Sequence, residues 1–131
     1  MRVVCDTAHD LGVPVTAHCR NAASVTAAAA AGVDLILHAS FMDDAGLEAV
    51  IEAAEVYFSS KGRRLSIEWT LIDGANDSDD QARKLAVIAK RLSAHVNVIA
   101  LNPTPLTADR PSDSDTIRSF VDTLIAHGAN A

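Results

Sequence analysis

Two histidines stand at the ends of predicted strands and are the first candidates for chemistry. His18 lies in the predicted strand 13–19, and His38 lies in the predicted strand 33–39. Imidazole can bind a metal ion or carry a proton near neutral pH. Zinc in proteins normally has three or four protein ligands, so two histidines alone make a weak zinc site. Cys5 and Cys19 form no C-x-x-C pair, and we expect reduced thiols rather than a disulfide.

Helices and strands alternate along the chain and would position these histidines. Apolar residues at steps of three and four, from Leu47 to Phe58, predict a long central helix over residues 43–62 that ends at Gly62. Such alternation with short connections predicts an α/β fold with a parallel sheet and right-handed crossovers. The predicted helices are 3–11, 21–31, 43–62, 78–92 and 112–127, and the predicted strands are 13–19, 33–39, 65–72 and 95–101.

Alternation within the strands predicts one apolar face and one polar face of the sheet. His18, Ile36, His38 and Glu68 fall on the polar face by this count. A polar face without helices suits the inside of a barrel better than a sheet covered on both faces. We therefore expect a single α/β domain over residues 1–131: four parallel strands forming half of a (βα)8 TIM barrel, with an extra N-terminal helix. The alternative is a flattened, flavodoxin-like sheet.

The predicted fold, the net charge and the distribution of apolar residues indicate which partners to expect. A half barrel leaves two open sheet edges and a bare inner face, so we expect a homodimer that covers them. The net charge of -6 and the isoelectric point near 5.1 lead us to expect no nucleic acid. No apolar run is long enough to span a membrane, and the first residues lack the pattern of a signal peptide, which predicts a cytoplasmic protein.

Residues 1 to about 50 resemble the metal-dependent amidohydrolase superfamily, nearest to its imidazolonepropionase-like members. The matching text is AHDLGVPVTAHCRNAASVTAAAAAGVDLILHASFMDDAGLEAV. The resemblance implies that His18 and His38 bind a divalent metal such as zinc. Glu68, on the polar face of the predicted strand 65–72, is our own candidate for a third ligand or base. The H-x-H pair and the aspartate that complete the family's site are absent from this sequence.

Residues from about 47 to 131 resemble the C-terminal part of radical-SAM methyltransferases that modify adenine in 23S ribosomal RNA. The matching elements are GRRLSIEW, LIDGAND and HVNVIALNP. The resemblance implies barrel strands, and it implies that Asn102 lies against S-adenosylmethionine. The family's C-x-x-x-C-x-x-C loop is absent, so we expect no iron–sulfur cluster.

Two resemblances that meet inside one helix suggest a chimera with its junction within residues 43–62. We therefore expect an engineered or recombined protein made of barrel fragments, with a structural role and no intact natural activity. A first alternative is a residual divalent-metal hydrolase that uses His18 and His38. A second alternative is a remnant that binds S-adenosylmethionine or a nucleotide at Asn102.

Overall fold

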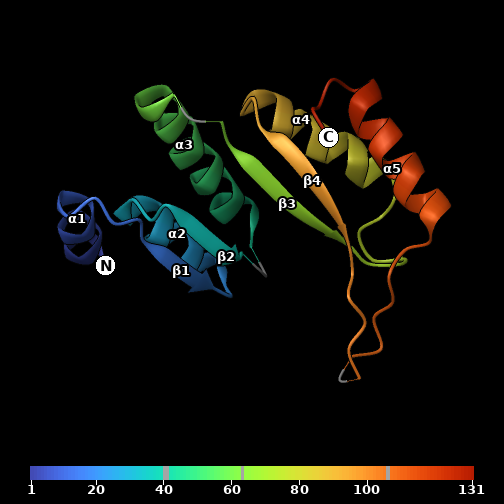
Figure 1. Ribbon diagram of the computed structural model, residues 1–131, viewed down its shortest axis with the longest axis horizontal. Coiled ribbons are helices and arrows are strands. Elements are labelled where there is room, and N and C mark those ends of the chain that lie inside the picture. The colour runs from blue at the N-terminus through green and yellow to red at the C-terminus, as the bar shows by residue number, and fades with distance from the viewer. Residues whose placement is uncertain (40–41, 63, 106) are drawn as a thin grey trace. The chain divides into compact units, whose positions relative to one another are not determined.

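A computed structural model describes residues 1–39, 42–62, 64–105 and 107–131, and it has the α/β alternation that the sequence predicts (Figure 1). Contacts divide the chain into two compact units, residues 1–61 and residues 62–131, which are described separately below. The predicted single domain stays a prediction. In chain order the elements are α1 (Arg2–Asp10), β1 (Thr16–Cys19), α2 (Ala22–Ala31), β2 (Leu35–His38), α3 (Asp44–Lys61), β3 (Ser66–Leu71), α4 (Asp79–Arg91), β4 (His95–Ala100) and α5 (Ser114–Ala126).

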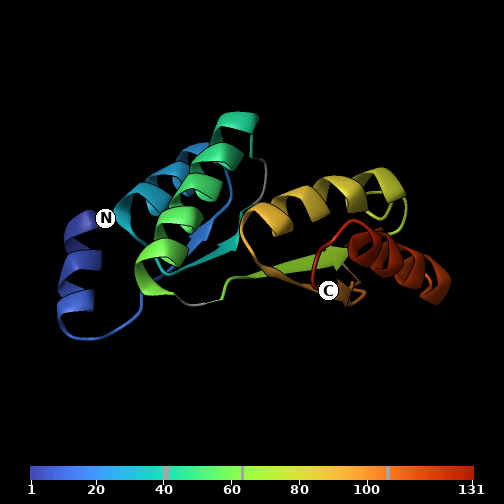
Figure 2. The same ribbon diagram turned by 90° about the horizontal axis from the view of Figure 1, so that it is seen from above.

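In the first unit, β1 and β2 form a parallel pair whose register joins Thr16 to Leu35 and Cys19 to His38. Helix α2 packs on this pair through Val25 and Ala28, which are both fully buried. Figure 2 shows α3 running beside α2. The unit is therefore a βαβ arrangement with two further helices, α1 and α3, as the alternating sequence predicts.

Local signals place the ends of α2 and α3. The Asn21 side chain accepts a hydrogen bond from Ser24 N–H at 2.9 Å, which caps the start of α2. Gly32 ends α2 with a φ of 82°, a left-handed conformation that glycine adopts without steric cost. The Asp43 side chain accepts from Gly46 N–H at 2.7 Å, so Asp43 opens the central helix as predicted.

Helix α1 is tied to this unit by a buried side chain and by polar contacts. Cys5 is fully buried, and His9 Nε2 lies 2.8 Å from Asp34 Oδ2. The same carboxylate oxygen accepts a hydrogen bond from Val15 N–H at 2.8 Å. Burial raises the pKa of Asp34, but the hydrogen bonds from Val15 and His9 outweigh burial, and the pKa lies below its usual value of 3.8.

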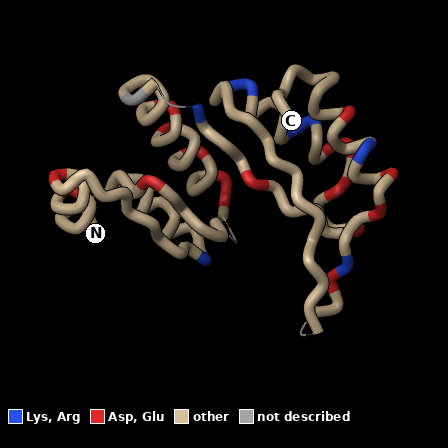
Figure 3. The backbone as a smooth tube through the Cα atoms, viewed as in Figure 1, with Lys and Arg blue, Asp and Glu red and all other residues tan. Residues whose placement is uncertain are grey.

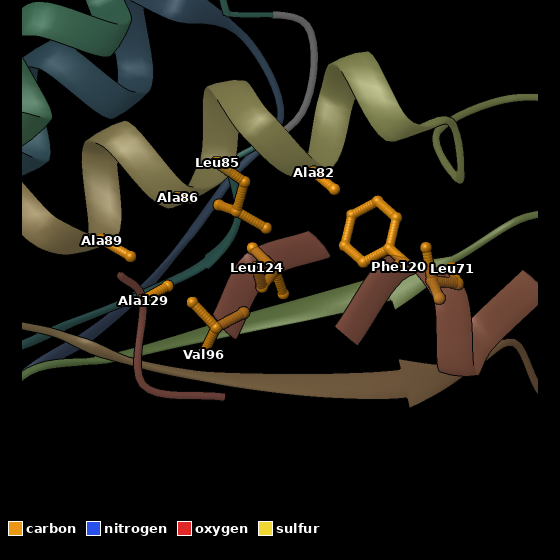
Figure 4. Close-up of a cluster of buried hydrophobic side chains, with 9 residues drawn as sticks. All are labelled: Leu71, Ala82, Leu85, Ala86, Ala89, Val96, Phe120, Leu124 and Ala129. Carbon is orange, nitrogen blue, oxygen red and sulfur yellow. The ribbon is translucent and has the colours of Figure 1, made fainter. Parts of the chain in front are cut away.

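In the second unit, β3 and β4 pair in parallel along their whole lengths, from Ser66 beside His95 to Leu71 beside Ala100. Helices α4 and α5 pack together on one face of this pair (Figure 2). Figure 4 shows Phe120 and Leu124 of α5 reaching the buried side chains of α4 and of the strands. The buried cluster consists of Leu71, Ala82, Leu85, Ala86, Ala89, Val96, Phe120, Leu124 and Ala129.

The predicted alternation is confirmed in β3 but is wrong in β2. Ile67 and Trp69 of β3 pack against the core, and Glu68 is exposed on the opposite face. In β2, Ile36 packs with the residues beneath α2, whereas Leu35 is 52% exposed. The strand therefore turns Ile36 toward the helices, the reverse of the prediction, because burial against α2 sets its direction.

Candidate functional site

The two predicted histidines lie together at the carboxyl ends of β1 and β2. His18 Nδ1 and His38 Nε2 are 2.9 Å apart, a hydrogen-bonding distance, and the ring centroids are 5.0 Å apart. The ladder places His38 opposite Cys19, so regular alternation would send it to the helix side with Ile36. His38 instead has a φ of 71°, and Ala39 has a φ of 46°. This left-handed backbone turns the imidazole away from that side and toward His18.

A direct N–H···N hydrogen bond occupies one nitrogen of each ring in this pair. Within either unit, the described residues hold no group of three or more His, Cys, Asp or Glu side chains arranged to bind a metal. Glu68, the third predicted ligand, belongs to the other unit. The metal site of His18, His38 and Glu68 therefore stays a prediction.

Glu68 has a partner that the sequence did not reveal. Asn97 Nδ2 on β4 donates to Glu68 Oε2 at 2.7 Å, across adjacent strands. The register places the two residues side by side on the exposed face of the pair. The alternation of residues along the strand predicts that Glu68 lies on this face. The residue beside it is identified only by the register of β3 with β4.

Asn102 lies at the carboxyl end of β4, the edge where open α/β sheets and barrels hold their ligands. Leu101 N–H donates to Leu71 O at 3.2 Å, which fixes the point where the chain leaves the sheet. Asn102 follows in the segment 101–111, is exposed, and has a side-chain amide that can donate and accept hydrogen bonds. Figure 1 shows residues 101–105 leaving the end of β4 and residues 107–111 leading back toward α5.

The loop after β3 is held by Asn76, the asparagine of LIDGAND. Its Oδ1 accepts from Ile72 N–H at 2.8 Å, and its Nδ2 donates to Thr70 O at 2.8 Å. Trp69 Nε1 donates to the Asn76 carbonyl at 3.4 Å. The motif therefore folds back on the end of its own strand, which fixes Asp73 at the same edge as Asn102.

A second contact in this region involves Asp77, whose position just before α4 would suit a helix-capping residue. Ser78 is the residue that caps α4, and Asp77 Oδ2 instead accepts a hydrogen bond from Ser112 Oγ at 2.7 Å. A contact between residues so distant in sequence is not visible from composition or spacing.

The cysteines in this sequence do not fit an iron–sulfur cluster. Such clusters are held by cysteine thiolates in sets of about four, and this sequence has two cysteines. Cys5 and Cys19 are both buried in the first unit, and Cys19 Sγ donates to Ser24 O at 3.4 Å.

Comparison with curated proteins gives relatives of one kind for residues from about 47 to 131. No family model matches the chain. The dual-specificity RNA methyltransferase RlmN 1 of Myxococcus xanthus is 38% identical over 81 residues, 62% of this chain and 23% of that protein. The ribosomal RNA large subunit methyltransferase N of Nitrosopumilus maritimus is 36% identical over 84 residues, 64% of this chain and 24% of that protein. The chain thus spans about a quarter of the length of these relatives.

A solved structure extends the similarity into the first unit. The crystal structure of a radical SAM methyltransferase from Sphaerobacter thermophilus matches with a TM-score of 0.67 and 30% identity, covering 92% of this chain and 41% of that one. Because 92% of the chain is matched, the match includes most of residues 1–61 as well as residues 62–131.

These findings correct two expectations about function. The expected engineered or recombined chimera without activity is wrong, because one kind of protein accounts for both parts of the chain, and nothing supports an amidohydrolase origin for residues 1 to about 50. The alanine-rich helix, glycine cap and apolar strand behind that resemblance are features that any βα unit needs. The alternative of a metal-dependent hydrolase, which depended on that resemblance, is therefore wrong as well.

The expectation that no nucleic acid is involved, which was inferred from the net charge, is also wrong. The relatives are by name RNA methyltransferases, and net charge sums a chain that spans only about a quarter of their length. No finding supports the expected homodimer. Among the described residues, no helix is both long and apolar enough to cross a membrane. Residues from about 47 to 131 are thus similar to radical-SAM RNA methyltransferases.

Proposed function

We propose that this chain is a segment of a radical-SAM RNA methyltransferase and supplies part of its S-adenosylmethionine-binding edge. The observation that carries the proposal is the similarity of residues from about 47 to 131 to several RNA methyltransferases at 35–45% identity. Methyl transfer to RNA belongs to the whole protein in those relatives. The role proposed for this segment is to hold the cofactor.

The position of Asn102 supports this role. Its exposed amide lies two residues after the end of β4, and the loop that carries Asp73 leaves β3 at the same edge of the β3–β4 pair. An amide side chain at that edge suits a ligand that carries both hydrogen-bond donors and acceptors, such as the adenine, ribose and amino-acid groups of S-adenosylmethionine.

The proposal also covers the type of sheet to which β3 and β4 belong. We infer that β3 and β4 are barrel strands rather than part of a flavodoxin-like sheet. Helices α4 and α5 pack on the face that carries Ile67 and Trp69, while Glu68 and Asn97 are exposed on the other face. A polar face without helices is expected inside a barrel, whereas doubly wound sheets have helices on both faces.

Charged side chains of both signs occur along the second unit, where Figure 3 shows acidic and basic residues interspersed along β3, α4 and α5.

Calorimetry with S-adenosylmethionine tests the proposal. We expect saturable binding, weakened about tenfold by Asn102→Ala, since one net hydrogen bond of about 1–1.5 kcal/mol corresponds to roughly that factor. Asn130→Ala is the matched control, because Asn130 is exposed and pairs with His95 at the opposite end of β4. Absence of binding at millimolar ligand, or equal loss in both variants, would overturn the proposal.

A further inference from the structure

The hydrogen bond between Asp77 and Ser112 joins two segments that are 35 residues apart in sequence. Asp77 lies in the loop after β3, and Ser112 lies at the end of the segment that carries Asn102. The donor and acceptor oxygens are 2.7 Å apart, and Ser112 is 5% exposed. A short bond to a carboxylate in a buried setting holds its two segments more firmly than an exposed bond between neutral groups.

Neither side chain is needed to cap a helix. The Ser78 side chain caps α4 by accepting from Gln81 N–H, and the Asp113 side chain caps α5 by accepting from Thr116 N–H at 2.8 Å. Asp77 and Ser112 each precede one of these capping residues. The bond therefore joins the entrances of the two helices and adds nothing to their capping.

Backbone contacts continue this junction toward the sheet edge. Ile72 forms an antiparallel bridge with Pro111, and Asp73 N–H donates to Arg110 O at 2.9 Å. Together with the Asp77–Ser112 bond, these contacts fasten the returning end of segment 101–111 to the loop after β3. The outgoing end is fastened by the bond from Leu101 N–H to Leu71 O.

We propose that Asp77 and Ser112 are positioning residues that hold residues 107–111, and through them Asn102, in the arrangement that binds ligand. The identity of the ligand rests on the proposed function. The holding role of Asp77 and Ser112, here called the clamp, rests on the contacts described above. Without the bond, Arg110 and Pro111 keep their backbone contacts with the loop after β3 but are held less firmly, so the returning end samples more conformations. Apparent affinity then falls in proportion to the fraction of molecules in the competent arrangement.

The test combines ligand binding with amide hydrogen exchange on the 131-residue chain. We expect Ser112→Ala to raise the Kd for S-adenosylmethionine about tenfold, as when the competent fraction falls about tenfold. Exchange of the Asp73 amide should quicken, whereas amides of the core residues Leu85 and Leu124 should keep their protection. Ser119→Ala, an exposed serine on α5, is the matched control and should change neither measurement.

A conservative variant separates positioning from general stability. Asp77→Asn keeps an oxygen that can accept from Ser112, so it should bind ligand more tightly than Asp77→Ala. Asp77→Ala also replaces Ser112→Ala as the test if that variant does not fold. Faster exchange throughout the core, or identical binding by Asp77→Asn and Asp77→Ala, would overturn the positioning role.

The outcomes distinguish this inference from the proposed function. If the unaltered chain binds S-adenosylmethionine and Ser112→Ala binds it equally well, the positioning role is wrong and the proposed function stands. If the unaltered chain does not bind, the proposed function fails, and exchange of the Asp73 amide decides the clamp alone. Faster exchange in Ser112→Ala then supports the clamp, and unchanged exchange refutes it.

Discussion

Replacing Asn76 with alanine tests whether LIDGAND folds back on its own strand as described. The change removes the hydrogen bond from Asn76 Nδ2 to Thr70 O and the acceptor for Ile72 N–H, both at 2.8 Å. A net hydrogen bond contributes about 1 kcal/mol, and an amide left half-buried without a partner costs about 1–3 kcal/mol. We therefore expect Asn76→Ala to lower the free energy of unfolding by about 2–4 kcal/mol.

Urea denaturation followed by Trp69 fluorescence is a suitable assay, since Trp69 is the single tryptophan and contacts the core of this unit. Asn76→Asp keeps an acceptor for Ile72 N–H but loses the donor to Thr70 O, so its loss should be smaller, about 1 kcal/mol. Asn130→Ala should change the unfolding free energy by less than about 0.5 kcal/mol, as expected for an exposed position. A loss of that small size in Asn76→Ala would refute the reasoning.

Three further predictions follow from the same contacts. Leu124→Ala, at a fully buried position, should cost about 2–5 kcal/mol in urea denaturation, and a smaller cost would mean that the core is loosely packed. The pKa of Asp34 in the folded protein lies below its usual 3.8, so the stability that ionised Asp34 contributes is complete above pH 3.8 and is lost as the pH falls through the folded pKa. In Asp34→Asn, this pH-dependent part of the stability should be absent from acid unfolding monitored by circular dichroism. The predicted metal site at His18 and His38 can be tested by zinc retention. If Glu68 completes the site, one zinc per chain should remain after desalting and be lost in His18→Ala; two histidines alone should release it, since zinc normally has three or four protein ligands.

The sequence was sufficient to predict the order of helices and strands because each element carries its own local signals. Gly32 ends α2, Asp43 opens α3 and Ser78 begins α4, all at positions that the sequence indicates. The alternation in β3 also survives, since Glu68 and its neighbours on that face are polar and the opposite face is apolar.

The features that sequence reasoning missed depend on long-range packing. The strand LILH is apolar on both faces, so its pattern does not determine whether Leu35 or Ile36 meets α2. The bond from Ser112 to Asp77 requires the segment after β4 to return to the loop after β3. The amidohydrolase resemblance was misleading because the matching residues are those of a βα unit and do not include a complete metal site.

Nuclear magnetic resonance on the isotopically labelled chain can map where S-adenosylmethionine binds. We expect saturable chemical-shift changes at Asp73, Leu101 and Asn102, at the carboxyl edge of β3 and β4, with the side-chain amide of Asn102 among the largest. Saturable changes confined to the outer surfaces of α4 and α5, or no changes at millimolar ligand, would contradict it.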